Sequence, residues 1–107
     1  MRAILAASAF TILSALGIGP ALADAIDGAW CHDQGDRMMI RGPLIVTPGG
    51  NRVQGDYSRH AFSYVVPAGE AGNGTLVRMV LMGEEHVQVQ FGQSTPVIWN
   101  RCGPPTS

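Results

Sequence analysis

Residues 86–91, His-Val-Gln-Val-Gln-Phe, alternate polar and apolar side chains without a break. Successive side chains of a β-strand point to opposite faces, so this pattern predicts a strand buried on one face and solvated on the other. Val87, Val89 and Phe91 are expected to face a core. Gly-Glu-Glu precedes the segment and a glycine follows it, which is typical of turns. The stretch therefore predicts a short strand between two turns.

The same alternation of strand and turn continues along the chain, which holds 14 Gly and 7 Pro in 107 residues. Beyond residue 23, no ten-residue stretch shows a helical period without a Gly or Pro inside it. Residues 75–82 are apolar almost throughout, so we expect this strand to be buried on both faces or central in the sheet. The predicted strands are 26–31, 37–41, 44–47, 52–57, 60–66, 75–82, 86–91 and 97–102.

The first 23 residues differ from the rest. Met1-Arg2 is followed by an uncharged stretch that ends in Ala21-Leu22-Ala23. A positive start, an apolar middle and small residues at the end are features of a secretory signal peptide. A retained transmembrane anchor is the alternative, which the Gly and Pro residues before the small-residue site disfavour. We predict a cleaved signal peptide over 1–23, one small β domain over 24–102, a flexible tail over 103–107, and a periplasmic or secreted location.

Two cysteines remain after the predicted leader, Cys31 and Cys102, close to the two ends of the domain. In an oxidising compartment an even number of cysteines predicts a disulfide, and two cysteines allow one intramolecular pairing. A redox pair or a metal site is disfavoured because Cys-x-x-Cys spacing and further ligands are absent from the sequence. A bond between the first and last strands brings them together. We therefore predict an all-β fold, a small antiparallel meander barrel of about seven or eight short strands, with a β-sandwich as the alternative.

The charge pattern argues against one class of partner. The formal net charge is −1, only 14% of the residues are charged, and none of them is lysine. The arginines beyond the leader are scattered singly, whereas nucleic-acid-binding proteins gather basic residues on one face. We expect no nucleic-acid partner, and contact with a membrane only transiently through the signal peptide.

Short motifs at the two ends of the predicted domain resemble those of a known family. Gly28-Ala29-Trp30 on the first strand and Trp99-Asn100-Arg101 on the last resemble the calycin-type arrangement of lipocalin-like barrels. This resemblance implies packing at a barrel end, in which Trp30 plugs the end and Arg101 covers it.

Over residues 28–102 the chain is also similar to a group of short, uncharacterised exported proteins of proteobacteria. In size, barrel form and single disulfide it resembles periplasmic inhibitors of proteases or lysozymes. These resemblances imply export and a barrel, and they carry no activity. The motifs that carry the similarity are Gly28-x-Trp30-Cys31, Val46-Thr47-Pro48-Gly49-Gly50, Gly55-Asp56-Tyr57, His60-Ala61-Phe62, Tyr64-Val65-Val66-Pro67 and Trp99-x-Arg101-Cys102.

The residue types on which catalysis and metal binding depend form no recognised set in this sequence. It lacks the Gly-x-Ser-x-Gly nucleophile elbow and a phosphate-binding loop with its lysine. His32 with Asp33 and Asp36 could form a weak cation site, but a polar turn is the favoured interpretation. We therefore predict no catalytic residue, no cofactor and no metal, and we expect the protein not to be an enzyme.

The densest group of polar and aromatic side chains lies in residues 55–60. Tyr57, Arg59 and His60 are the predicted binding surface, because Tyr and Arg often anchor binding surfaces and this turn falls at one barrel end. The alternatives are that Arg59 pairs with Asp56 across the turn and that His60 is a hydrogen-bonded rim residue.

These observations favour a small periplasmic binding or inhibitor-like barrel module, with a periplasmic or extracellular protein as its partner. The alternative is a structural or envelope-associated protein without a specific ligand, and a small enzyme is less favoured.

Overall fold

The computed structural model describes residues 25–33 and 35–103, and these contain nine β-strands and no helix. No helix in these ranges could therefore span a membrane. The predicted leader, 1–23, and residues 104–107 of the predicted tail lie outside the described ranges. The strands are β1 (Gly28–Cys31), β2 (Arg37–Arg41), β3 (Leu44–Val46), β4 (Arg52–Gln54), β5 (Asp56–Ser58), β6 (Ala61–Val65), β7 (Leu76–Leu81), β8 (His86–Phe91) and β9 (Val97–Arg101).

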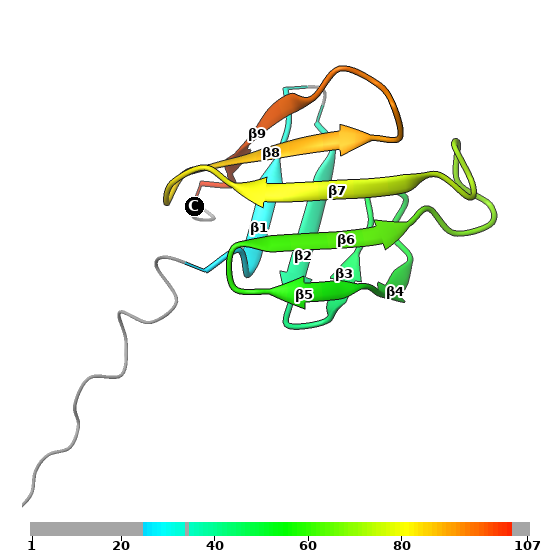
Figure 1. The fold of residues 1–107 in the computed structure, drawn as a ribbon, viewed down its shortest axis with the longest axis horizontal. Helices are drawn as coiled ribbons and strands as arrows, with labels where there is room; N and C mark the ends of the chain where they lie inside the picture. Colours follow the sequence, from blue (N-terminus) through cyan, green and yellow to red (C-terminus); the bar gives the residue numbers. More distant parts are fainter. Residues whose placement is uncertain (1–24, 34, 104–107) are drawn as a thin grey trace, which may run out of the picture.

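All nine strands belong to one antiparallel sheet in the order β4-β3-β2-β1-β9-β8-β7-β6-β5. The two edge strands, β4 and β5, are consecutive in the chain and separated by a single residue. The sheet must therefore curl until its edges meet, and it forms a nearly closed barrel (Figure 1). The predicted all-β antiparallel barrel is confirmed, with one strand more than the upper estimate.

The extra strand arises at Gly55, where the predicted continuous strand 52–57 divides into β4 and β5. β4 pairs with β3, whereas β5 pairs with β6. A Cβ atom at Gly55 would lie 2.2 Å from the carbonyl oxygen of Ser63 and 2.7 Å from the Phe62 ring. Only glycine lets the chain pass this close to β6 and change its pairing partner.

The barrel interior is filled by inward-facing side chains from both halves of the sheet. Val87 and Val89 of β8 are fully buried and Phe91 is partly buried, as the alternation predicts. Of the two alternatives for 75–82, burial on both faces is wrong, whereas a position inside the sheet is confirmed, because β7 lies between β8 and β6. β7 buries Val77 and Met79 and exposes the alternate residues, because the outer surface of a barrel wall faces solvent even where its side chains are apolar. The core comprises Ile26, Trp30, Met38, Ile40, Ile45, Phe62, Tyr64, Val66, Val77, Met79, Val87, Val89 and Trp99.

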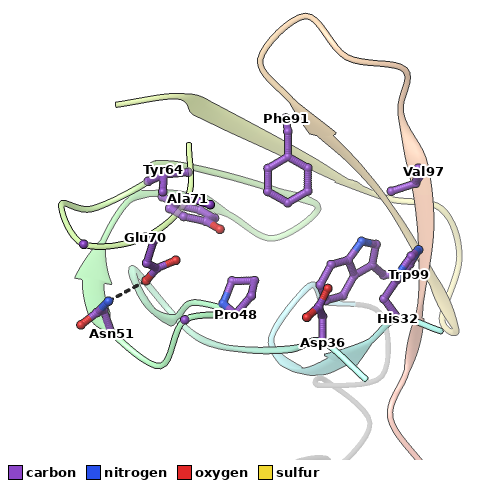
Figure 2. A pocket seen from close by; sticks show the side chains of 13 residues that line it. His32, Asp36, Pro48, Asn51, Tyr64, Glu70, Ala71, Phe91, Val97 and Trp99 are labelled. Atoms are coloured by element: carbon purple, nitrogen blue, oxygen red, sulfur yellow. Dashed lines mark hydrogen bonds between the residues drawn. The ribbon is translucent and has the colours of Figure 1, made fainter. Parts of the chain in front are cut away.

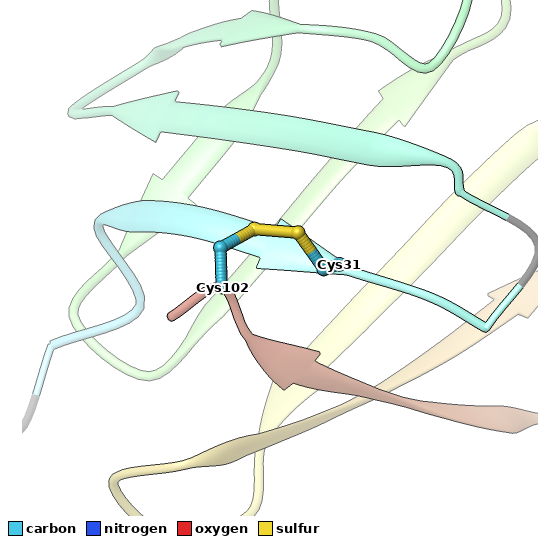
Figure 3. Close-up of a disulfide and its surroundings, with 2 residues drawn as sticks. All are labelled: Cys31 and Cys102. Carbon is cyan, nitrogen blue, oxygen red and sulfur yellow. A yellow bond between two sulfur atoms is a disulfide. The ribbon is translucent and has the colours of Figure 1, made fainter. Parts of the chain in front are cut away.

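A second junction between the halves lies where β1 meets β9. This pairing is short, with two register pairs, Trp30↔Arg101 and Cys31↔Asn100. The predicted disulfide is present at this place: Cys31 ends β1, Cys102 follows β9, and their Cα atoms are 5.0 Å apart (Figure 3). The covalent bond therefore reinforces the shortest pairing near the middle of the sheet.

We predict that Gly55→Ala lowers the free energy of unfolding by about 2–3 kcal/mol, because the new methyl group overlaps backbone atoms of β6. Urea denaturation of the disulfide-bonded protein measures this loss. Gly103→Ala is the matched control, because its Cβ would meet no atom within 4 Å. Equal stability of the two variants would contradict the role given to Gly55.

We predict that replacing both Cys31 and Cys102 by serine lowers the free energy of unfolding by about 4 kcal/mol, since the bond closes a loop of sequence separation 71. Comparing urea denaturation of this variant with that of the oxidised protein gives the difference. Reduction of the wild-type protein should shift the midpoint equally. A loss well below 1 kcal/mol would show that the β1–β9 junction holds without the bond.

Candidate functional site

The two ends of the barrel are built from different segments. Because the strands run antiparallel, the β1–β2, β3–β4, β6–β7 and β8–β9 connections gather at one end. The β2–β3, β5–β6 and β7–β8 turns gather at the other end, together with residues 25–27 that lead into β1. We call the first the open end and the second the closed end, for the reasons that follow.

Arg101 closes its end of the barrel by stacking on a tryptophan and donating hydrogen bonds to backbone carbonyl groups. Its guanidinium carbon lies 4.1 Å from the centroid of the Trp30 ring. Its nitrogens donate hydrogen bonds to the carbonyl oxygens of Asp27 at 2.5 Å, Ala25 at 2.9 Å and Glu84 at 2.9 Å. A guanidinium presents its donors in a rigid fork, which suits it to join three segments at once. Trp30 and Arg101 thus pack against each other at the closed end of the barrel.

Gly28 makes room for that guanidinium. Its φ is +118°, a conformation that other residues avoid, and a Cβ atom would lie 2.7 Å from Nη1 of Arg101. The Trp30 indole N–H donates to the Ile26 carbonyl at 2.9 Å. Gly28, Trp30 and Arg101 therefore act as one packing unit, in which the Trp30 indole and all three guanidinium nitrogens donate to backbone carbonyl groups.

The predicted binding surface lies at this closed end. The Tyr57 hydroxyl donates to Asp27, and this hydrogen bond raises the pKa of the Tyr57 phenol. The backbone carbonyl of Arg59 accepts from the Ile26 N–H at 2.8 Å, and the His60 side chain is exposed. The three residues share one end, as the sequence predicts. Tyr57 lines a shallow hollow on the barrel wall, and none of the three reaches the largest pocket.

That pocket, of about 470 Å³, lies at the open end (Figure 2). Aromatic side chains from three strands line it, namely Tyr64 of β6, Phe91 of β8 and Trp99 of β9. Pro48, Val66 and Val97 add further apolar surface. Concave, mostly apolar pockets of this volume with a few polar groups are typical ligand sites. The open end is therefore the candidate functional site.

Glu70 fixes one wall of the pocket by joining two loops. Its carboxylate accepts hydrogen bonds from the buried Thr47 hydroxyl and from Nδ2 of Asn51, the latter at 2.6 Å. A Cβ atom at Gly49 would lie 2.4 Å from the Glu70 carboxyl carbon, so glycine permits this close approach. The β6–β7 loop that carries Glu70 is further held by its own backbone hydrogen bonds. The wall is thus formed before any ligand arrives.

Two polar groups at the base of the pocket have unusual surroundings. Burial raises the pKa of Tyr64 to about 12, and the nearby Glu70 carboxylate adds to the rise. The Tyr64 hydroxyl has a weak acceptor, the Met38 sulfur at 3.9 Å. Trp99 is 2% exposed, and its indole N–H is buried without a hydrogen-bond partner among the described residues. Figure 2 shows the indole nitrogen on the side of the ring turned toward Phe91 and Val97.

The β1–β2 turn supplies the opposite wall, with His32 and Asp36. The His32 ring packs against Trp99 at a centroid distance of 5.1 Å, and its backbone N–H donates to the Asp36 carbonyl at 3.0 Å. Figure 2 places the Asp36 and Glu70 carboxylates on different sides of the pocket. Within residues 25–33 and 35–103, no group of three or more His, Cys, Asp or Glu side chains is arranged to hold a metal ion.

Comparison with protein-family models, with curated proteins and with solved structures found no match. The likeness to exported proteobacterial proteins and to periplasmic inhibitors therefore stays a prediction. The residues that form the site were outside the predicted binding surface. The predicted order of strands could have indicated these residues, because in a meander every second connection lies at the same end of the sheet.

We predict that the free energy of unfolding falls as the pH rises from 10 to 12. The phenol of Tyr64 ionises near 12 when folded and near 10 when unfolded, so the unfolded state loses its proton first. The stabilisation is present in full below pH 10 and is lost as the pH approaches 12. Urea denaturation at a series of pH values measures the slope, which should be smaller for Tyr64→Phe because only Tyr57 then contributes. An unchanged slope in that variant would contradict the assignment.

Proposed function

We propose that this protein is an exported binding module that takes a small ligand into the open end of its barrel. The observation that carries the proposal is the pocket of about 470 Å³ lined by Tyr64, Phe91 and Trp99. One of its walls is fixed by the Glu70 hydrogen bonds, so that wall loses little conformational freedom when a ligand binds. The buried Trp99 N–H is a donor that a ligand oxygen can satisfy.

Export is part of this proposal. The signal-peptide pattern of residues 1–23 supports it, and the Cys31–Cys102 disulfide is the kind of bond that persists in oxidising compartments. The described residues that line the pocket include none of the hydroxyl or thiol nucleophiles Ser, Thr and Cys.

The two tryptophans provide a direct test by nitrogen-15 NMR, because each gives one indole N–H signal. Trp99 reports on the pocket, and Trp30 reports on the closed end. We predict that, among mixtures of small alcohols, amines, carboxylic acids and phenols, some compounds shift the Trp99 signal and leave the Trp30 signal in place.

Blocking the pocket gives the matched control. Ala71 lines the pocket and Ala68 lies in the same loop outside it, and both are exposed. Ala71→Trp should abolish the Trp99 shifts, whereas Ala68→Trp should leave them intact. If no compound moves the Trp99 signal, or if the two variants respond alike, the proposed site is wrong.

A further inference from the structure

The charged groups around the pocket share one sign. Asp36 and Glu70 both line it, on different sides, and neither arginine nor lysine is among the described lining residues. The carboxylate of Glu70 also contributes to the raised pKa of Tyr64, which lines the same pocket. An anionic ligand would meet two carboxylates with no arginine to offset the repulsion, and His32 is the remaining basic side chain of the described lining.

The uncharged surface of the pocket also favours a cationic ligand over an anionic one. The rings of Tyr64, Phe91 and Trp99 come from three different strands and line one space, in which Phe91 is the most exposed of the three and the other two are almost fully buried. The faces of aromatic rings carry partial negative charge and attract cations, and sites formed by several rings are known for quaternary ammonium groups. Apolar surface and carboxylates together suit a ligand whose positive charge is spread over carbon.

We infer that the pocket binds a small organic cation, an ammonium group on a short apolar body that carries a hydrogen-bond acceptor. The ammonium group lies between the aromatic rings and the carboxylates of Asp36 and Glu70. The acceptor meets the Trp99 indole N–H, which is buried and unpartnered. Figure 2 shows that N–H on the side of the ring turned toward Phe91 and Val97, and since it is buried, an acceptor reaches it only if side chains move. The inference rests on the proposed function and specifies its ligand.

Three probes of matched shape separate charge from size. Choline carries a quaternary ammonium and a hydroxyl group. Its neutral isostere has carbon in place of the quaternary nitrogen, and the tert-butylacetate anion keeps the same bulky group with a negative charge. Titrations at fixed ionic strength follow the Trp99 indole signal, with the Trp30 signal as internal reference. We expect choline to bind about tenfold more tightly than the neutral isostere, and the anion to bind most weakly.

A pair of charge variants tests the location. Asp36 lines the pocket, whereas Asp33 lies in the same turn, is exposed and does not line it. Asp36→Asn should weaken choline binding about threefold and leave the neutral isostere unaffected. Asp33→Asn should change neither. An unshifted Trp30 signal in each variant shows that the barrel is intact.

The outcomes distinguish this inference from the proposed function. If the neutral isostere or the anion moves the Trp99 signal as strongly as choline does, the pocket binds ligands but does not select cations, and the inference is overturned. If Asp33→Asn weakens choline binding as much as Asp36→Asn, the attraction is a general surface effect and the inference is again overturned. If none of the three probes moves the Trp99 signal, the cation site is refuted, and the wider compound mixtures decide separately whether the pocket binds ligands.

Discussion

The barrel depends on one residue without a side chain. At Gly55 the chain leaves its pairing with β3 and joins β6, and a single methyl group there would overlap the Ser63 carbonyl. One continuous stretch, 52–58, thereby serves as an edge for both halves of the sheet. The opposite junction, between β1 and β9, has two register pairs and the Cys31–Cys102 bond. The two halves are thus joined covalently on both sides, by the chain itself and by the disulfide, which suits a domain with a small core.

The two ends of the barrel differ in how they are filled. Residues 25–27 cross the closed end and bring it the carbonyl groups that Arg101 requires. The positive charge of the Arg101 guanidinium is compensated there by backbone carbonyl oxygens and by the Trp30 ring, so this side chain stabilises the fold. At the open end, by contrast, the carboxylates of Asp36 and Glu70 line the pocket and no arginine is among the described lining residues. The chemistry available to a ligand is therefore aromatic and anionic.

Local patterns of the sequence predicted much of the wall but not the site. The alternation over 86–91 predicts correctly which side chains of β8 face inward, because that choice depends only on neighbouring residues. The apolar run over 75–82 was misleading, since hydrophobicity does not report which face a barrel turns to solvent. The contact of Glu70 with Thr47 and Asn51 joins loops about twenty positions apart. Each loop alone has the sequence of an ordinary turn. The hydrogen bonds that form the pocket wall therefore cannot be predicted from either loop by itself.

The two tryptophans differ in whether the fold supplies a partner for the indole N–H. Trp30 and Trp99 are both almost fully buried, and each buries one strong donor. The fold satisfies the Trp30 N–H with the Ile26 carbonyl at 2.9 Å, which is possible because residues 25–27 run past it. The Trp99 N–H has no such segment and no described partner, and a buried donor left unpaired costs about 1–3 kcal/mol.

Folded proteins seldom retain such a cost in an ordinary core, and they retain it more often where function requires the group. Here the unpaired donor belongs to a side chain that lines the pocket of about 470 Å³, with Asp36 nearby and Glu70 on another side of the pocket. A ligand acceptor that reaches the Trp99 N–H removes the cost of the unpaired donor, and that recovered free energy adds to the affinity of the site. Trp99, which forms part of the core, can in this way also contribute favourably to the free energy of ligand binding.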